Sequence, residues 1–199
     1  MLLEINVQTA EQLIVSPEMI REDTVIPVEF PEHPDSRYRA GYDWLFIYER
    51  RIAKFLEKWL RRYRYQLIGE KGIVCEALSN AFSHGHNKDP LLPIFVRVMK
   101  GEKGLVLSIE DSGKGFNVKE VYKKYRNNKQ YYYTAGNGLR LMAESSIFGI
   151  FYDSTGCIFN MLYLFKENFD FVSQEIIIKP KNLADNNCTG RITSAGNLP

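Results

Sequence analysis

The chain has 199 residues, of which 45% are hydrophobic and 25% charged, and its 26 basic and 24 acidic side chains leave a net charge of +2. This balance excludes collagen-like, strongly acidic and wholly disordered chains. The longest uncharged apolar run, residues 157–165, is far shorter than the roughly 20 residues that cross a bilayer. The three cysteines are odd in number and widely spaced, which favours free thiols over a disulfide framework. We therefore expect a cytoplasmic globular protein that does not bind membranes.

The first half of the chain predicts a strand and two helices. Residues 24–30 have the composition of a strand that ends at a proline-containing segment. From residue 42 an apolar side chain recurs every three or four positions, which predicts a long amphipathic helix ending near residue 65. A second helix is expected over residues 70–84, ending at Gly85 because glycine commonly follows a helix.

The second half predicts two hairpins separated by a loop and a helix. The expected strands are 94–99 and 105–110, then 149–152 and 157–165; the loop is 116–133, with some helix, and the third helix is 138–148. This order of elements predicts an α+β fold, a two-layer sandwich with helices on one face of a mixed, mostly antiparallel sheet.

The domain organisation follows from these elements. We expect an N-terminal extension with a strand over residues 1–40, one domain over 41–165, and a C-terminal extension over 166–199. Within this last segment, residues 169–178 are expected to add a strand, and the polar composition after Pro180 predicts a disordered tail.

Positive charge is concentrated in two stretches. Residues 50–64 carry seven basic side chains against one acidic side chain, and residues 114–129 carry six against one. Such stretches are typical of a solvated helix face, and also of a surface that meets an anionic ligand or an acidic partner. Neither contains a motif that reads a nucleic-acid groove, so we expect no direct binding to nucleic acid.

Three polar side chains recur at intervals of four within the second predicted helix. Glu76, Asn80 and His84 would share one face of that helix. A carboxylate there can accept a proton from an attacking hydroxyl, and an amide oxygen suits Mg²⁺, a hard cation that also takes phosphate and water oxygens. A solvated polar face is the alternative interpretation of this pattern.

Two glycine-containing segments have the composition of a nucleotide site. The run Asp111-Ser112-Gly113-Lys114-Gly115 follows a predicted strand, and its carboxylate can accept a hydrogen bond from an exocyclic amine such as that of adenine. The run Gly136-Asn137-Gly138-Leu139 opens the third predicted helix, where free N–H groups and the helix dipole favour phosphate. Each segment alone is also explained as a local turn or helix start, because neither has the full P-loop or Gly-x-Gly-x-x-Gly pattern.

Taken in this order, the three segments resemble the N box and the two glycine boxes of the ATPases grouped as gyrase, Hsp90, histidine kinase and MutL, over about residues 73–164. The run from Cys75 to Gly85 is similar to the N box of anti-sigma factor serine kinases, and Thr155-Gly156 before an apolar strand is similar to their last conserved box. The resemblance implies a Bergerat ATP-binding fold. It also implies transfer of the γ-phosphate of Mg·ATP to a serine or threonine of a small antagonist protein, and sequestration of a sigma factor.

The resemblance implies a role for each matching residue. Glu76 is expected to be the general base, Asn80 the Mg²⁺ ligand and Asp111 the adenine anchor. The remaining nucleotide-binding residues are expected to be His84, Gly113, Gly115, Gly136, Gly138, Leu139 and Thr155. Residues 116–135 would form the ATP lid, whose basic side chains can neutralise phosphate charge.

The same resemblance implies protein partners, namely a sigma factor, an anti-sigma factor antagonist, or both. An arginine of the long helix, Arg50 or Arg51, is expected to contact a partner, and homodimers are common in the family that the chain resembles. Two alternatives stay open: a nucleotide-gated protein-binding module without kinase activity, and the ATP-binding half of a split histidine kinase.

Overall fold

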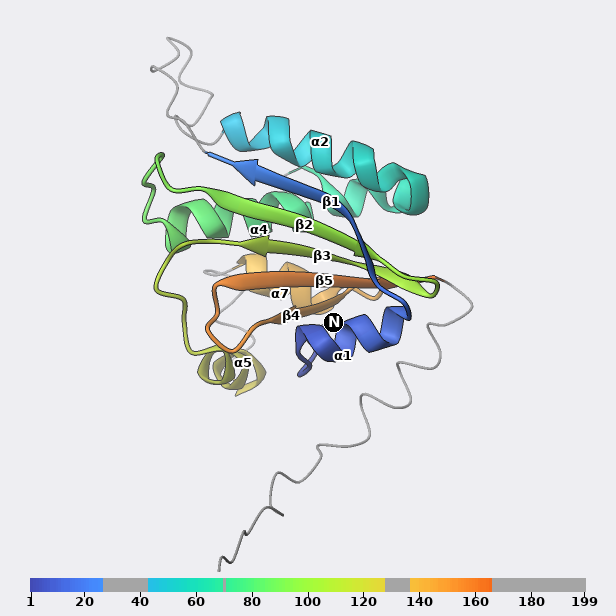
Figure 1. Cartoon of the computed structure of the whole chain (residues 1–199). Coiled ribbons are helices and arrows are strands. Elements are labelled where there is room, and N and C mark those ends of the chain that lie inside the picture. Colours follow the sequence, from blue (N-terminus) through green and yellow to red (C-terminus); the bar gives the residue numbers. More distant parts are fainter. Residues whose placement is uncertain (27–42, 70, 128–136, 166–199) are drawn as a thin grey trace, which may run out of the picture.

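A computed structural model describes residues 1–26, 43–69, 71–127 and 137–165. Within these residues, five strands form one sheet in the order β1-β2-β3-β5-β4, and all four ladders between them are antiparallel (Figure 1). The strands are β1 (Glu18–Val25), β2 (Ile94–Lys100), β3 (Gly104–Glu110), β4 (Gly149–Tyr152) and β5 (Ile158–Leu164). A single parallel bridge joins Leu2 to Ile150. The predicted α+β fold with a mostly antiparallel sheet is confirmed.

The helices lie on both sides of this sheet, with α4 and α7 behind it and α1 on the other side (Figure 1). They are α1 (Val7–Ile14), α2 (Asp43–Leu60), α3 (Arg64–Leu67), α4 (Ile73–Asn80), α5 (Val118–Asn127) and α7 (Asn137–Glu144), with a 3₁₀ turn at Arg61–Tyr63 and a π-helical turn at Ala81–Gly85. None of the helices in the described ranges is long and apolar enough to cross a membrane.

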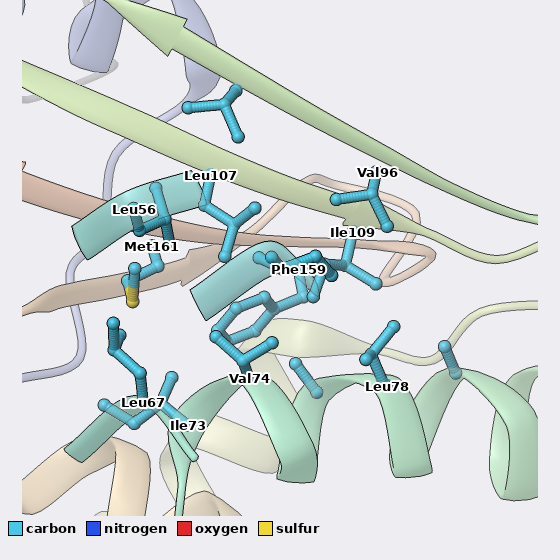
Figure 2. Packing of buried hydrophobic residues seen from close by; sticks show 14 of the residues in the cluster. Leu56, Leu67, Ile73, Val74, Leu78, Val96, Leu107, Ile109, Phe159 and Met161 are labelled. Carbon is cyan, nitrogen blue, oxygen red and sulfur yellow. The ribbon is translucent and has the colours of Figure 1, made fainter. Parts of the chain in front are cut away.

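The main core lies between the sheet and the helices behind it. Successive side chains of a strand point to opposite faces, so Leu107 and Ile109 of β3 face these helices and are buried. Figure 2 shows Val74 and Leu78 of α4 pointing toward the sheet, where Phe159 of β5 meets them. This packing holds α4 firmly against the sheet, and α4 carries the polar side chains of the candidate site.

A second, smaller core lies on the opposite face, where no helix was predicted. Ala10 and Ile14 of α1 are fully buried there, together with Val106 and Phe151 of the sheet. The helix begins at Asn6, whose side-chain oxygen accepts a hydrogen bond from the N–H of Thr9 at 2.8 Å. The helices therefore do not all lie on one face, because this eight-residue element covers part of the other.

Strand β1 begins earlier than the sequence predicts. It spans Glu18–Val25 rather than 24–30, and residues 27–30 lie outside the described residues. Its first part is rich in charged residues, which have low strand propensity, so the sequence alone does not predict a strand there. In the sheet these charges pair across strands, as when Arg97 Nε of β2 donates to Glu22 at 3.0 Å. Charged side chains are typical of edge strands.

The remaining elements follow the predictions, except that the third predicted helix, α7, ends at Glu144 and not at residue 148. Both hairpins are confirmed, and the long helix is confirmed as α2, which continues through the 3₁₀ turn into α3. The 116–133 loop contains a regular helix, α5, over its first part. The expected strand at 169–178 and the expected tail lie outside the described residues.

Candidate active site

A cavity of about 570 Å³ lies between α4, the loop after β3 and the first turn of α7. This volume is typical of sites for small molecules and cofactors. Its polar lining is Glu76, Asn80, His84 and Asp111, its glycines are Gly85, Gly115, Gly138 and Gly156, and its apolar lining is Ala77, Ala81, Ile109, Phe116, Val121, Leu139, Tyr152 and Phe159. The three sequence segments that resemble nucleotide boxes thus meet at one cavity.

Glu76 is held between its own helix and α7. The side chain of Asn80 donates a hydrogen bond to its carboxylate, and burial raises the pKa of Glu76 above its ordinary value in spite of Asn80 and His84. A Cβ atom added to Gly138 would lie 1.8 Å from Glu76 Oε1, so the carboxylate rests directly on the α7 backbone. The carboxylate therefore sits at the N-terminal end of α7, which is where a helix attracts phosphate.

His84 belongs to a π-helical turn and not to a regular helix as the spacing predicts. The chain leaves α-helical geometry after Asn80, and the N–H of His86 donates to the carbonyl oxygen of Ala81 at 2.9 Å, five residues back. Single π-helical turns are frequent at functional sites. His84 is exposed at the cavity wall, where its charge favours the ionised form of Glu76.

Asp111 lies at the opposite side of the cavity, in the loop that follows β3. Its Oδ1 accepts a hydrogen bond from the N–H of Gly113 at 2.8 Å. A Cβ atom on Gly85 would lie 2.3 Å from Asp111 Cγ, so the carboxylate packs on the backbone of the π-helical turn. Burial raises the pKa of Asp111. The carboxylate is thus fixed in the wall as a hydrogen-bond acceptor.

Aromatic rings form part of the apolar lining of the cavity. The ring centroids of Phe116 and Tyr152 are 4.9 Å apart, and those of Tyr152 and Phe159 are 5.7 Å apart, both pairs edge to face. Sequence reasoning missed these three residues. The alternation of side chains along a strand could have indicated two of them. Tyr152 and Phe159 are register partners in the β4–β5 hairpin, so their side chains lie on the same face of the sheet. Such walls accept a flat heterocycle.

Two predicted nucleotide-binding residues are placed differently from the prediction, and a third is not among the described residues. Thr155 is not in the cavity wall, because its hydroxyl donates to Asp153 Oδ2 at 2.5 Å and accepts from the N–H of Cys157 at 3.2 Å. It shapes the turn whose backbone meets Gly115. Gly113 contacts Asp111 instead of lining the cavity, and Gly136 lies outside the described residues. The predicted roles of all site residues stay predictions.

Comparison with known proteins agrees with this geometry. Residues 48–146 match the family model of the histidine kinase-like ATPase domain, a range that contains α4, the Asp111 loop and α7. No curated protein shows a significant match to the chain. The chain therefore carries an ATP-binding domain of the gyrase, Hsp90, histidine kinase and MutL superfamily.

Proposed function

We propose that the protein is an Mg·ATP-dependent serine/threonine protein kinase of the anti-sigma factor type, which phosphorylates a small antagonist protein. The observation that carries this proposal is the position of Glu76. Its carboxylate lies against Gly138 at the start of α7, in the same cavity as Asp111. This position supports a role for Glu76 as the general base at the phosphate end of the proposed nucleotide site, where an acceptor hydroxyl would have to approach.

The proposed reaction uses the two ends of the cavity differently. Asp111 and the aromatic rings bind adenine, which places the triphosphate toward Gly138. The acceptor hydroxyl attacks the γ-phosphorus, Glu76 takes the hydroxyl proton, and ADP leaves as the bond to the β-phosphate oxygen breaks. Because burial raises the pKa of Glu76, its carboxylate is a stronger base than an exposed one.

The donor set of the cavity suits Mg²⁺ better than zinc. In the part of the chain that the structure describes, no three His, Cys, Asp or Glu side chains gather where they could hold a metal. Asn80 offers an amide oxygen in the cavity wall, so the ion would be held by Asn80 together with phosphate and water oxygens. When bound, Mg²⁺ would neutralise the charge of the transferred phosphoryl group.

The proposal includes a sigma factor, an anti-sigma factor antagonist, or both as protein partners, with homodimerisation and a cytoplasmic location carried over from the sequence. The support is the exposed basic side of α2. Arg50, Arg51, Lys54 and Lys58 are all exposed, and an acidic partner surface would complement them.

Phosphate transfer from γ-labelled Mg·ATP tests the proposal. The label is added to cleared native lysate with wild-type protein, with Glu76→Gln, or with Glu102→Gln, an exposed glutamate of the β2–β3 turn that serves as control. We expect an acid-stable label on a small protein with wild type and the control, and none with Glu76→Gln.

Other outcomes contradict the proposal in defined ways. An acid-labile label would indicate the ATP-binding half of a histidine kinase. No transfer, with ATP still bound, would indicate a nucleotide-gated binding module. Equal transfer by Glu76→Gln would exclude Glu76 as the base.

A further inference from the structure

His86 is a buried histidine behind the loop that carries Asp111. It follows the π-helical turn, and only 2% of its surface is exposed. Its Nε2 atom accepts a hydrogen bond from the backbone N–H of Ser112 at 3.0 Å. Ser112 directly follows Asp111 in the chain, so the imidazole holds the loop immediately beside the carboxylate.

The loop has further contacts with the same part of the chain. The carboxylate of Asp111 packs on the backbone of Gly85, and a Cβ atom on Gly113 would lie 2.2 Å from the carbonyl oxygen of Gly85. The hydroxyl of Ser112 donates to the carbonyl oxygen of Pro93 at 3.4 Å. This close packing requires glycine both in the turn, at Gly85, and in the loop, at Gly113. His86 supplies the side-chain acceptor that fixes the distance between the loop and the turn.

The hydrogen bond to Ser112 requires a neutral imidazole. With Nε2 as acceptor, the proton of the neutral ring is on Nδ1, which is buried and has no hydrogen-bond partner among the described residues. A second proton would have to be added at Nε2, where it would face the N–H of Ser112. Burial lowers the pKa of His86, while the acidic groups that face it, Asp111 and Asp89, oppose this shift.

We propose that His86 is a positioning residue of the nucleotide site: its neutral imidazole holds the Asp111 loop in the geometry that binds adenine, and protonation of the imidazole releases the loop. The proposal rests on the assignment of the cavity as the ATP site, and it does not depend on whether the protein is a kinase. Nucleotide affinity should then fall as the pH falls through the range in which His86 takes up its second proton.

Three proteins separate this effect from other titrations. His86→Gln keeps an oxygen acceptor near the place of Nε2 and does not titrate, whereas His86→Leu removes the acceptor and keeps an apolar side chain. The phosphates of ATP also titrate in acid, and they do so in wild type and in His86→Gln alike, whereas the pKa of Asp111 depends on the charge of His86. The difference between those two proteins therefore reports the protonation of His86 together with its effect on Asp111.

The experiment measures ATP dissociation constants by calorimetry from about pH 7.5 to about pH 4.5, a range that extends well below the ordinary pKa of histidine because burial lowers the pKa of His86. At the upper end we expect His86→Gln to bind nearly as tightly as wild type, and His86→Leu to bind about fivefold to tenfold more weakly. Toward the lower end, wild type should lose at least about threefold more affinity than His86→Gln.

The outcomes distinguish failure of this proposal from failure of the site assignment. Parallel pH profiles for wild type and His86→Gln would overturn the role of protonation, and wild-type affinity in His86→Leu would overturn the positioning role. Thermal unfolding of all three proteins under the same conditions shows whether a loss of affinity is only a loss of folded protein. A wild-type protein that binds no ATP at any pH would contradict the site assignment itself.

Discussion

At the scale of single residues, the contact between Gly138 and Glu76 determines the geometry of the cavity at the start of α7, the proposed phosphate end of the site. A side chain as small as one methyl group would lie 1.8 Å from the Glu76 oxygen. Since Glu76 is also held by Asn80 and is half-buried, the carboxylate has little room to move away. Glycine is therefore required at position 138 because of the neighbouring Glu76 side chain, as well as for the proposed close approach of phosphate to the backbone.

Gly138→Ala should weaken ATP binding about tenfold, because the added methyl group displaces Glu76 or tilts the first turn of α7. The double variant Gly138→Ala/Glu76→Ala removes the clashing carboxylate and should recover most of the affinity that the single variant loses. Calorimetric titration of ATP into wild type and the variants, Glu76→Ala included, gives the coupling between the two positions. Purely additive effects would show that the contact does not shape the site.

At the scale of elements, α1 extends the domain on the face that helices α4 and α7 leave uncovered. Its buried side chains complete a second core against β3, β4 and β5. The sequence alone does not predict this helix, because its eight residues make only about two helical turns, too few for a clear apolar periodicity. Its stability comes from the sheet on which it packs, and so it should be sensitive to single changes on its inner face.

Ala10→Asp should destabilise the protein by at least about 2 kcal/mol, because it places a carboxylate at a fully buried position without a designed partner. Gln12→Asp introduces the same side chain at an exposed position of the same helix and should change stability by less than about 0.5 kcal/mol. Urea unfolding of both variants measures the difference. Similar stability of the two variants would show that α1 is not part of the folded core.

At the scale of the whole molecule, the sequence predicts the main sheet, the helices behind it and the order of the nucleotide boxes. Those features depend on local periodicity and on short motifs, which a single sequence shows directly. Features that depend on tertiary neighbours were not predictable. Glu49 precedes a basic stretch, and its sequence position predicts an exposed side chain. In the structure it is buried, and its Oε1 accepts a hydrogen bond from the N–H of Gly69 at 2.5 Å. Likewise, only the fold shows that Tyr152 and Phe159 line the cavity.

The π-helical turn is the clearest case in which a correct motif predicted the wrong local geometry. A spacing of four aligns Glu76, Asn80 and His84 on an ideal α-helix, but the extra residue in the turn changes the direction of the chain after Asn80. This change brings Gly85 against Asp111 and His86 against Ser112. These contacts join the two halves of the predicted site, the α4 segment and the Asp111 loop, and no sequence motif predicts them.

Titration of ATP and GTP into wild type and Asp111→Asn tests whether this cavity binds ATP with Asp111 as the adenine anchor. The N–H of Gly113 holds the remaining amide oxygen in place of Oδ1, so the amide nitrogen of the variant would turn a donor toward the adenine amine. We expect wild type to prefer ATP to GTP and Asp111→Asn to bind ATP at least about tenfold more weakly than wild type. Equal ATP affinity in the two proteins, or equal affinity of wild type for ATP and GTP, would contradict this assignment.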